Sequence, residues 1–347
     1  MGTNQQIKNI IKMETTLKTD TNIKTVKLYR QNFYTQPVVL IDGITRTGKT
    51  MLSPILTSLE NVELHRIETN FDRIPRLYKL KKITRDAAVA CLRLEMETKL
   101  YESMISRSIN FRWSDNTGVF NQIKPLRYLK RLFAPEGDVV VEKILKEKPI
   151  FQVQTHDVLG INGIYFDAFG NSLRIIEMLR HPVDSIYGNC QRGYGKRESN
   201  DPRIFSLNIL HGKKLVPWYC YGWEDEYIAC ESPTDKVIKM CAVRLRRMWK
   251  GYESLSDKQK KQVLFIAFDK FATNPEPDVQ KMENFIGRKR TKLLHKALTK
   301  GRVPRIIKSE EREKKEQDIR SKASSECITI MEDLVKEYEE RVKSIYG

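Results

Sequence analysis

Long apolar segments are missing from this chain of 347 residues. No uninterrupted apolar run approaches the roughly 18 residues that a membrane-spanning helix needs. The opening stretch, MGTNQQIKNIIKMETTLKTD, also lacks the apolar core of a signal peptide. We therefore expect a protein that has no transmembrane segment and works in the cytoplasm.

Cysteines at metal-binding spacing are missing as well. The six cysteines form no CxxC pair, and none stands at zinc-finger spacing from one of the five histidines. Buried, reduced thiols are the simpler interpretation of these cysteines. The sequence therefore predicts no metal site.

Charge, in contrast, is present in excess and mostly of one sign. The formal net charge is +18, which suits a nucleic acid, an anionic membrane, an acidic polymer or a polyanionic cofactor. Many of the cations lie in stretches such as RKRTKLLHKALTKGR (288–302). Because no RNP-like or zinc-finger signature accompanies them, a solvated surface explains most of these lysines. We expect no specific nucleic-acid partner.

Short apolar runs alternate with longer helical patterns along the chain. The runs are VVLID (38–42), VELHRIE (62–68), IFQVQT (150–155), LRIIEML (173–179) and VLFIAF (263–268). Runs of this kind are typical of a parallel sheet that is covered by helices on both faces. We predict an α/β fold with three layers and a central parallel sheet of about five strands, of the P-loop-containing nucleotide-binding type.

The helical patterns suggest how the chain is divided. Residues 85–109, 236–253 and 275–286 read as helices, and Gly287 closes the last of them. From Lys308 onward the sequence is a densely charged helical tail. We expect an N-terminal extension (1–30), an α/β domain (31–300) and a C-terminal helical segment (301–347) that packs on this domain. Whether the chain forms a homo-oligomer is left open.

The stretch DGITRTGKTML (42–52) carries the clearest chemical signal. It matches GxxxxGK[ST], follows an apolar strand and precedes an apolar helical start, which is the context of a phosphate-binding loop. Gly43 and Gly48 allow the backbone to turn its N–H groups inward, and Arg46 or Lys49 supplies positive charge. In a kinase or ATPase, Lys49 would bind phosphates, Thr50 would hold Mg²⁺, and Asp269 would complete the metal site.

Two further residues are expected at the same edge of the sheet. His156 follows the run 150–155, and Arg180 follows the run 173–179. Ligands of parallel α/β folds bind at the carboxyl ends of the strands, so both side chains should face the crevice that holds the phosphate loop. A guanidinium in this position suits a second phosphate group.

Four places in the chain together resemble the sulfotransferase family. RTGKT (46–50) is similar to the family's 5′-phosphate loop, and QTH (154–156) is similar to its strand-end Lys-Thr-His. RHPVD (180–184) resembles the Arg-x-Pro-x-Asp of the 3′-phosphate motif. The stretch from 263 to 287 resembles a late family segment: an apolar strand, an acidic turn, Asn-Pro, a helix and a closing glycine. The four occur in the family's order.

The resemblance implies a donor, 3′-phosphoadenosine 5′-phosphosulfate (PAPS), and a transferred sulfuryl group, with no metal required. It implies His156 as the catalytic base, with Glu68 as the alternative base, and Arg180 as the ligand of the 3′-phosphate. The 5′-phosphate would be held by the loop residues, and Arg46 and Lys49 would stabilise its developing charge; the loop set is Thr45, Arg46, Thr47, Gly48, Lys49, Thr50 and Met51.

The residues expected around the 3′-phosphate depart from the family pattern. Where the family's 3′-phosphate motif has a serine, this chain has Gly188, and we expect Ser185 to replace that serine from a neighbouring turn. Arg288 is expected to add charge near the 3′-phosphate.

The acceptor is less defined by the sequence. The aromatic and acidic stretch VPWYCYGWEDEY (216–227) suits either an acceptor pocket or core packing. A carbohydrate or another small molecule with a hydroxyl or amine group is expected as the acceptor. The alternatives are a kinase or ATPase that uses Mg-ATP, and a basic polyanion binder whose loop has no catalytic role.

Overall fold

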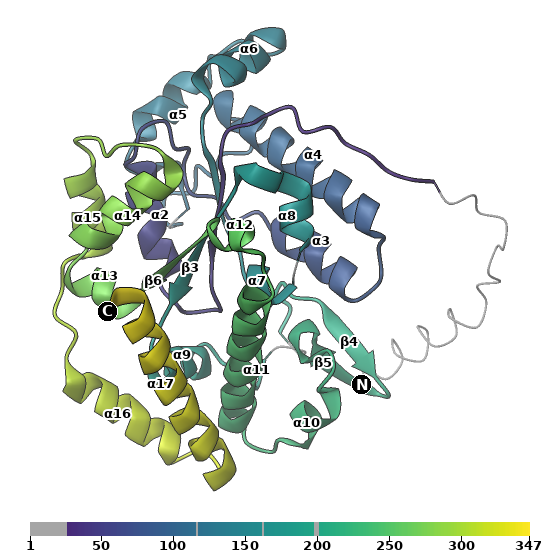
Figure 1. Cartoon of the computed structure of the whole chain (residues 1–347), viewed down its shortest axis with the longest axis vertical. Coiled ribbons are helices and arrows are strands. Elements are labelled where there is room, and N and C mark those ends of the chain that lie inside the picture. The colour runs from purple at the N-terminus through teal and green to yellow at the C-terminus, as the bar shows by residue number, and fades with distance from the viewer. Residues whose placement is uncertain (1–25, 116, 162, 198–200) are drawn as a thin grey trace.

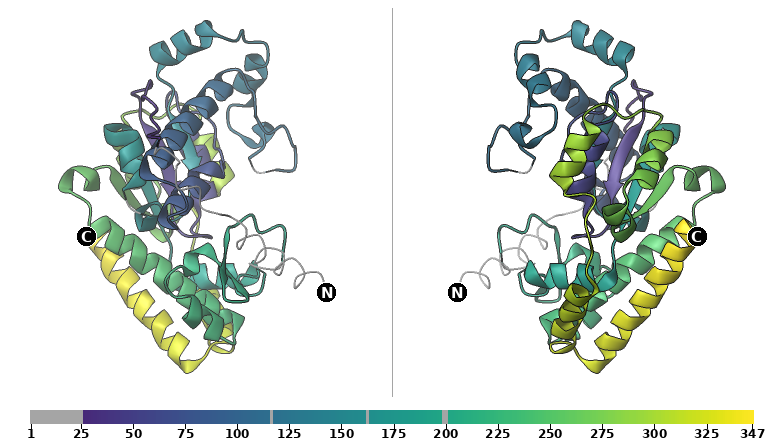
Figure 2. Two further views of the ribbon diagram at one scale, coloured as in Figure 1. Left: turned by 90° about the vertical axis from the view of Figure 1, so that its right-hand side faces the viewer. Right: turned by 90° about the vertical axis from the view of Figure 1, so that its left-hand side faces the viewer.

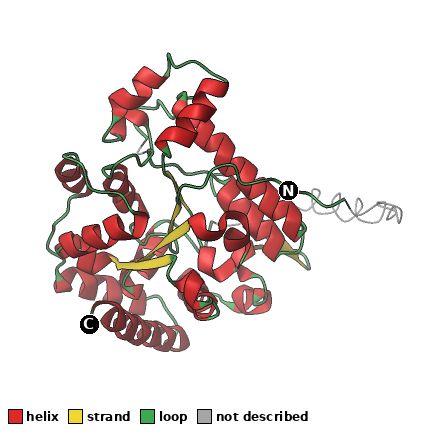
Figure 3. Cartoon of the chain, turned by 45° about the horizontal axis from the view of Figure 1, so that its top comes forward, coloured by secondary structure: helices red, strands yellow, loops and turns green. Residues whose placement is uncertain are grey.

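A parallel sheet of four strands forms the centre of the computed structural model, which describes residues 26–115, 117–161, 163–197 and 201–347. Its order is β2 (Phe151–Gln154), β1 (Val38–Asp42), β3 (Leu173–Leu179) and β6 (Val263–Ala267). Figure 3 shows these strands enclosed by helices. The α/β class with a central parallel sheet is therefore confirmed. Residues 1–25 of the expected N-terminal extension lie outside the described residues.

The two faces of the sheet bury alternate side chains of the same strands, because successive strand residues point to opposite sides. Val38 and Leu40 face one apolar cluster, and Val39 and Ile41 face the other. Helices cover both clusters (Figure 1). The first is covered by α3 (Asn70–Lys79), α4 (Arg85–Met104), α6 (Asp138–Glu147), α7 (Val158–Ile161), α8 (Ile164–Phe169), α9 (Pro182–Gln191), α10 (Glu224–Ala229) and α11 (Pro233–Glu253). The second is covered by α2 (Lys49–Thr57), α13 (Phe268–Thr273), α14 (Glu276–Ile286) and α15 (Leu294–Gly301).

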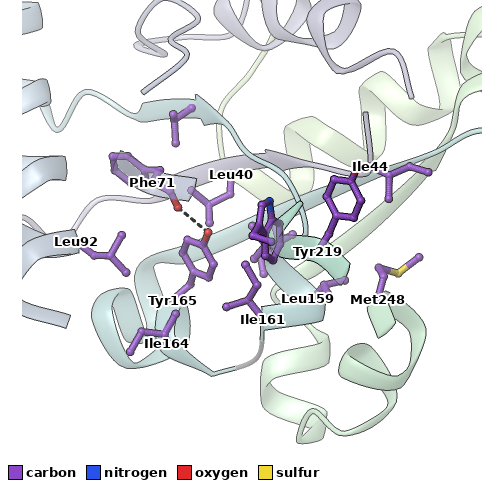
Figure 4. Close-up of a cluster of buried hydrophobic side chains, with 14 of the residues drawn as sticks. Leu40, Ile44, Phe71, Leu92, Leu159, Ile161, Ile164, Tyr165, Tyr219 and Met248 are labelled. Carbon is purple, nitrogen blue, oxygen red and sulfur yellow. Dashed lines mark hydrogen bonds between the residues drawn. The ribbon is translucent and has the colours of Figure 1, made fainter. Parts of the chain in front are cut away.

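Figure 4 shows part of the first cluster around Tyr165. The ring is buried beside Leu40 and Leu92, and its hydroxyl donates a hydrogen bond of 2.7 Å to the main-chain oxygen of Phe71. This bond ties α8 to the start of α3, the helix that follows the segment 62–68. Outside these layers lie α5 (Pro125–Arg131), α12 (Asp257–Lys260) and a hairpin of β4 (Asn208–His211) and β5 (Lys214–Pro217).

The predicted strand at 62–68 is wrong, so the sheet has four strands rather than five. The segment does run beside β2, since Glu63 N donates to Ile150 O and Gln154 N donates to Arg66 O. Only Val62 forms a bridge, with Ile150. Between these contacts the Gln152 side chain takes one ladder bond, since its Nε2 donates to Glu63 O. Leu64 N donates to the Tyr128 hydroxyl on the side away from β2.

The charged C-terminal segment folds as two helices, α16 (Ser309–Arg320) and α17 (Ser325–Tyr346). Both pack against α9, and α17 also lies along α11 (Figure 2). Met331 and Leu334 are buried on the inner face of α17. The helix α16 therefore lies against α9, the helix that Arg180 immediately precedes. Among the described residues, no helix has the length and apolar character to cross a membrane.

Candidate functional site

The phosphate loop is a tight turn between β1 and α2. Gly43 and Gly48 have φ angles of 133° and 102°, in a region that side chains rarely adopt. A methyl group at residue 48 would also lie 2.5 Å from the ring of Phe268. The Thr47 hydroxyl donates to Ile44 O at 3.0 Å, and Met51 N donates to Gly48 O at 2.9 Å. The loop thus ends at the N-terminus of α2, where an anion is favoured.

Lys49 points inward from this loop rather than toward solvent. Its ammonium group is buried and donates to the main-chain oxygens of Gly43 and, at 2.9 Å, of Ile44. Burial lowers the pKa of Lys49 to about 8, although the charge of Asp42 opposes the shift. The sequence analysis expected Lys49 to act on a phosphate, whereas in this structure its ammonium group bonds main-chain oxygens of the loop itself. Lys49 therefore stabilises the loop from its buried side.

Two carboxyl groups accompany Lys49 beneath the loop. Asp42 at the end of β1 and Glu177 on β3 are paired residues of neighbouring strands, and both are buried. Burial and the nearby Asp42 raise the pKa of Glu177 well above its ordinary value, which favours the protonated form of Glu177 beside Asp42. Asp42 also accepts a bond of 2.7 Å from the main-chain nitrogen of Val158. Lys49 and the two carboxyl groups therefore form a buried polar cluster at the base of the loop.

His156 lies where β2 ends, beside the same loop. The chain here is tied to β1 and α2, since Thr155 N donates to Ile41 O and the Thr50 hydroxyl donates to Gln154 Oε1 at 3.2 Å. Asp72 of α3 accepts two bonds of 2.9 Å from His156, one from the main-chain nitrogen and one from Nδ1. With its proton on Nδ1, the imidazole presents Nε2 as the acceptor.

The surroundings of His156 favour its neutral form. Burial lowers the pKa of His156, the positive charge of Lys49 lowers it further, and Asp72 opposes both. Asp72 is in turn paired with Arg76 at 3.0 Å, and the Arg76 guanidinium lies 4.6 Å from the centre of the Trp218 ring. A neutral imidazole held at one nitrogen can accept a proton at the other.

The aromatic stretch 216–227 is mainly core. Trp218, Tyr219, Trp223 and Tyr227 are buried. Of its aromatic side chains only Tyr221 is exposed. Core packing therefore accounts for most of the composition of this stretch. Trp218 is linked to the site through Arg76, whose guanidinium lies over its ring.

Glu68, the alternative base, has other partners. Arg66 Nε donates to its carboxylate at 2.5 Å, and the Lys99 ammonium lies 4.0 Å away. Arg66 also bonds the Ser103 hydroxyl and the main-chain oxygen of Ser108. The carboxylate of Glu68 is thus drawn into an ionic cluster on the outer side of β2.

Arg180 lies at the end of β3, on the other side of the loop from His156. Its Nη1 donates to Arg46 O at 3.3 Å, and its guanidinium lies 4.2 Å from the centre of the Phe268 ring. The buried Nε has no hydrogen-bond partner among the described residues. Arg305, which the sequence analysis did not single out, lies over the same ring at 4.9 Å.

Gly188 stands where the family's 3′-phosphate motif has a serine, and the side chain of Arg46 lies beside it. A methyl group at Gly188 would lie 3.4 Å from Cβ and from Nε of Arg46, so the exposed Arg46 side chain crosses α9 there. Thr45 is tied to the same helix by a bond of 2.7 Å to Asn189. Ser185 is buried in α9, and its hydroxyl has no partner within the described ranges.

Arg288 is not brought to this edge. Its Nη2 donates to Lys148 O, and Lys148 precedes the first residue of β2. It therefore lies at the amino ends of the strands, whereas the loop, His156 and Arg180 lie at the carboxyl ends. This position does not support the expected contact of Arg288 with a 3′-phosphate.

Asp269 and Asp184 share an arginine from α16. Arg312 Nη2 donates to Asp269 at 2.6 Å and to Asp184 at 2.9 Å. Lys315 takes the second oxygen of Asp184 at 2.6 Å. No sequence pattern signals these contacts, because the partners lie more than 40 residues apart and ion pairs leave no periodic pattern.

Comparison with known proteins matches most of the chain to one enzyme family. A family model described as a sulfotransferase domain matches residues 36–337. The chain belongs to the sulfotransferase family. No curated protein sequence matches it.

Solved sulfotransferase structures are similar to the chain only at low identity. The sulfotransferase domain of the Synechococcus PCC 7002 olefin synthase is 11% identical, with 90% of this chain and 98% of that chain covered and a TM-score of 0.45. The sulfotransferase from Alicyclobacillus acidocaldarius is 14% identical, with coverages of 87% and 96% and a TM-score of 0.36. The sulfotransferase STF9 from Mycobacterium avium is 11% identical, with coverages of 83% and 77% and a TM-score of 0.38.

The candidate site of this sulfotransferase lies along one edge of its sheet. Following the strand order β2, β1, β3, the edge carries His156, then the phosphate loop, then Arg180. In the part of the chain that the structure describes, no cluster of three His, Cys, Asp or Glu side chains is arranged to hold a metal ion.

Proposed function

We propose that this sulfotransferase uses PAPS as donor and transfers the sulfuryl group to a hydroxyl or amine of a small-molecule or carbohydrate acceptor, with His156 as the base. The observation that carries the proposal is the order His156, phosphate loop, Arg180 along adjacent strands. Neighbouring strands lie about 4.8 Å apart, so the ends of β2 and β3 are roughly 10 Å from each other. The phosphate loop follows β1, between these two ends, so a 5′-phosphate held there would lie between the base at β2 and the 3′-phosphate ligand at β3.

The residues present fit this donor. The buried Nε of Arg180 lacks a hydrogen-bond partner among the described residues, and its positive charge suits the 3′-phosphate. The positive φ angles of Gly43 and Gly48 form a tight turn before the N-terminus of α2, where a 5′-phosphate would be favoured. Arg46 reaches from this loop toward α9 and adds charge between the two phosphates. When bound, PAPS would supply the sulfuryl group.

The roles of the side chains follow from their positions. His156 would accept the proton of the acceptor at Nε2, because Asp72 fixes Nδ1. Arg46, Arg180 and the main chain of the loop would stabilise the negative charge that remains on the nucleotide. Lys49 would act indirectly, by holding the carbonyl groups of Gly43 and Ile44 so that the loop keeps its shape.

A kinase or ATPase is less well supported by the same geometry. Its metal ion would need oxygen ligands from Thr50 and Asp269, each about 2.1 Å from the metal. Thr50 bonds Gln154 at the end of β2, whereas Asp269 follows β6 and pairs with Arg312. Because β1 and β3 lie between these strands, the two ends are separated by roughly 14 Å.

Two measurements test the proposal. Without Mg²⁺, 3′-phosphoadenosine 5′-phosphate should raise the melting temperature of the protein, and Mg-ATP should not. Labelled PAPS should then give a labelled product with some member of a panel of sugars, phenols, alcohols and amines. Stabilisation by Mg-ATP alone, with none by the bisphosphate, would contradict the proposed donor.

A further inference from the structure

The guanidinium of Arg180 is held in place without an ion pair. It rests on the Phe268 ring at 4.2 Å and donates to Arg46 O at 3.3 Å. Within the described ranges it pairs with no carboxylate, and its buried Nε has no partner. Arg180 is half-buried, so a carboxylate nearby would be expected to pair with it unless another cation takes that carboxylate first.

Two such carboxylates lie close by. Burial lowers the pKa of Arg180, and the negative charges of Asp184 and Asp269 oppose that shift. Asp184 is one turn into the helix that Arg180 precedes, and Asp269 follows the neighbouring strand β6. Either would be a natural partner for Arg180 in the absence of other cations.

Arg312 of α16 forms ion pairs with both of these carboxylates instead. Its Nη2 is 2.6 Å from Asp269 and 2.9 Å from Asp184, and its Nε is 3.2 Å from Asp184. Lys315, one turn further along the same helix, bonds the other oxygen of Asp184 at 2.6 Å. Arg312 and Lys315 therefore take both carboxylates, and neither pairs with Arg180. The positive charges of Arg305 and Arg46 also act on Arg180.

We propose that Arg312 is a positioning residue that neutralises Asp184 and Asp269 and so keeps Arg180 available for the 3′-phosphate of the donor. The inference rests on the donor proposed above, because it assigns Arg180 a phosphate to bind. It gives the C-terminal helix α16 a part in donor selection, although α16 contributes no group to the phosphate loop itself.

The test compares two nucleotides that differ only in the 3′-phosphate. Calorimetry gives the Kd of 3′-phosphoadenosine 5′-phosphate and of adenosine 5′-phosphate, and their ratio measures what the 3′-phosphate contributes. The wild-type protein should prefer the bisphosphate, and Arg180→Ala should abolish the preference. In Arg312→Ala the Asp269 carboxylate loses its cation and pairs with Arg180, so the preference should fall by about tenfold, as expected for one charged hydrogen bond.

Rescue separates this role from a merely structural one. In the triple variant Arg312→Ala, Asp184→Asn, Asp269→Asn no carboxylate competes for Arg180, and the preference should return to within about threefold of the wild-type value. The matched control is Arg320→Ala, which removes an arginine of the same helix that pairs with Glu316 and Glu332. The melting temperature of each variant is measured alongside. If Arg312→Ala does not fold, Arg312→Gln removes the charge while keeping most of the side-chain length.

The outcomes are distinct. An unchanged preference in Arg312→Ala or Arg312→Gln overturns the inference, and so does a loss that the two Asn substitutions do not restore. Equal weakening of both nucleotides would show that Arg312 only braces α16, which also overturns it. If the wild-type protein itself binds the two nucleotides equally, the proposed donor fails first and the inference fails with it.

Discussion

Asp72 fixes both the backbone and the ring of His156, although the two residues lie 84 positions apart. One carboxylate oxygen accepts from the main-chain nitrogen and the other accepts from Nδ1. The ring therefore has one orientation and one tautomer, and these are the properties that a general base requires. Glu68, in contrast, is held by the cations Arg66 and Lys99.

Replacing the two candidate bases separately distinguishes them. His156→Ala should lower kcat by at least about 100-fold, the usual contribution of a general base. Glu68→Ala should leave kcat within about threefold, because its carboxylate neutralises Arg66 rather than facing an acceptor. Steady-state transfer from labelled PAPS measures both. Full turnover in His156→Ala together with loss in Glu68→Ala would make Glu68 the base.

The pH profile reports the surroundings of His156. Its charged form cannot accept a proton, so activity is lost as the pH falls through its pKa, which burial places below the ordinary value of about 6.5. Asp72→Asn removes the charge that raises this pKa, so the acid limb of kcat/KM should move to lower pH while kcat falls about tenfold. The control is Asp225→Asn, because Asp225 pairs with the more exposed His211 at 2.9 Å. An acid limb that does not move would contradict this assignment.

Lys49 should matter for stability more than for donor binding. Lys49→Thr removes the cation that faces Asp42 and leaves two buried carbonyl groups without their donor, which should cost about 3 kcal/mol of unfolding free energy. Denaturant unfolding measures this cost, and Lys146→Thr on the exposed face of α6 is the control. Where the variant is folded, the Kd of 3′-phosphoadenosine 5′-phosphate should stay within severalfold. Loss of nucleotide binding at unchanged stability would show that Lys49 contacts a phosphate directly.

The loop should not tolerate a side chain at Gly48. Gly48→Ala combines a φ angle of 102° with a contact of 2.5 Å to Phe268, so we expect both lower stability and loss of nucleotide binding. Gly287→Ala is the matched control, since its φ angle is 70° but the added methyl group meets nothing within 4 Å. The control should cost about 1 kcal/mol and leave binding intact. Comparable behaviour of the two variants would mean that the ring of Phe268 does not set the loop's position.

The strands were largely predictable because their apolar runs are short, β-branched and followed by turns. The runs 38–42 and 173–179 match β1 and β3 to the residue, and the run 263–268 extends one residue beyond β6. The run 62–68 alternates apolar and polar residues, a pattern that also predicts a strand, yet the Gln152 side chain takes one of its ladder bonds. The error therefore arises from a contact distant in sequence.

The site was predictable where strand ends define it and not where helices complete it. His156 and Arg180 follow apolar runs, which places them at the carboxyl edge. Asp72 and Arg312 reach the site from helices whose packing no local pattern specifies. Arg288 was expected there because of its charge, and charge alone does not determine which edge of the sheet a residue occupies.

Both borders of the central sheet are closed by a tyrosine hydroxyl from a distant segment. On β6 the main-chain nitrogen of Ala267 donates to Tyr346 at 2.9 Å, and beside β2 that of Leu64 donates to Tyr128 at 2.7 Å. Exposed strand borders invite pairing with other chains and aggregation. Tyr346 is the penultimate residue of the sequence. Removing a few C-terminal residues would therefore leave the main-chain nitrogen of Ala267 on β6 without this partner. The expected consequence is self-association of the protein rather than loss of its transfer activity.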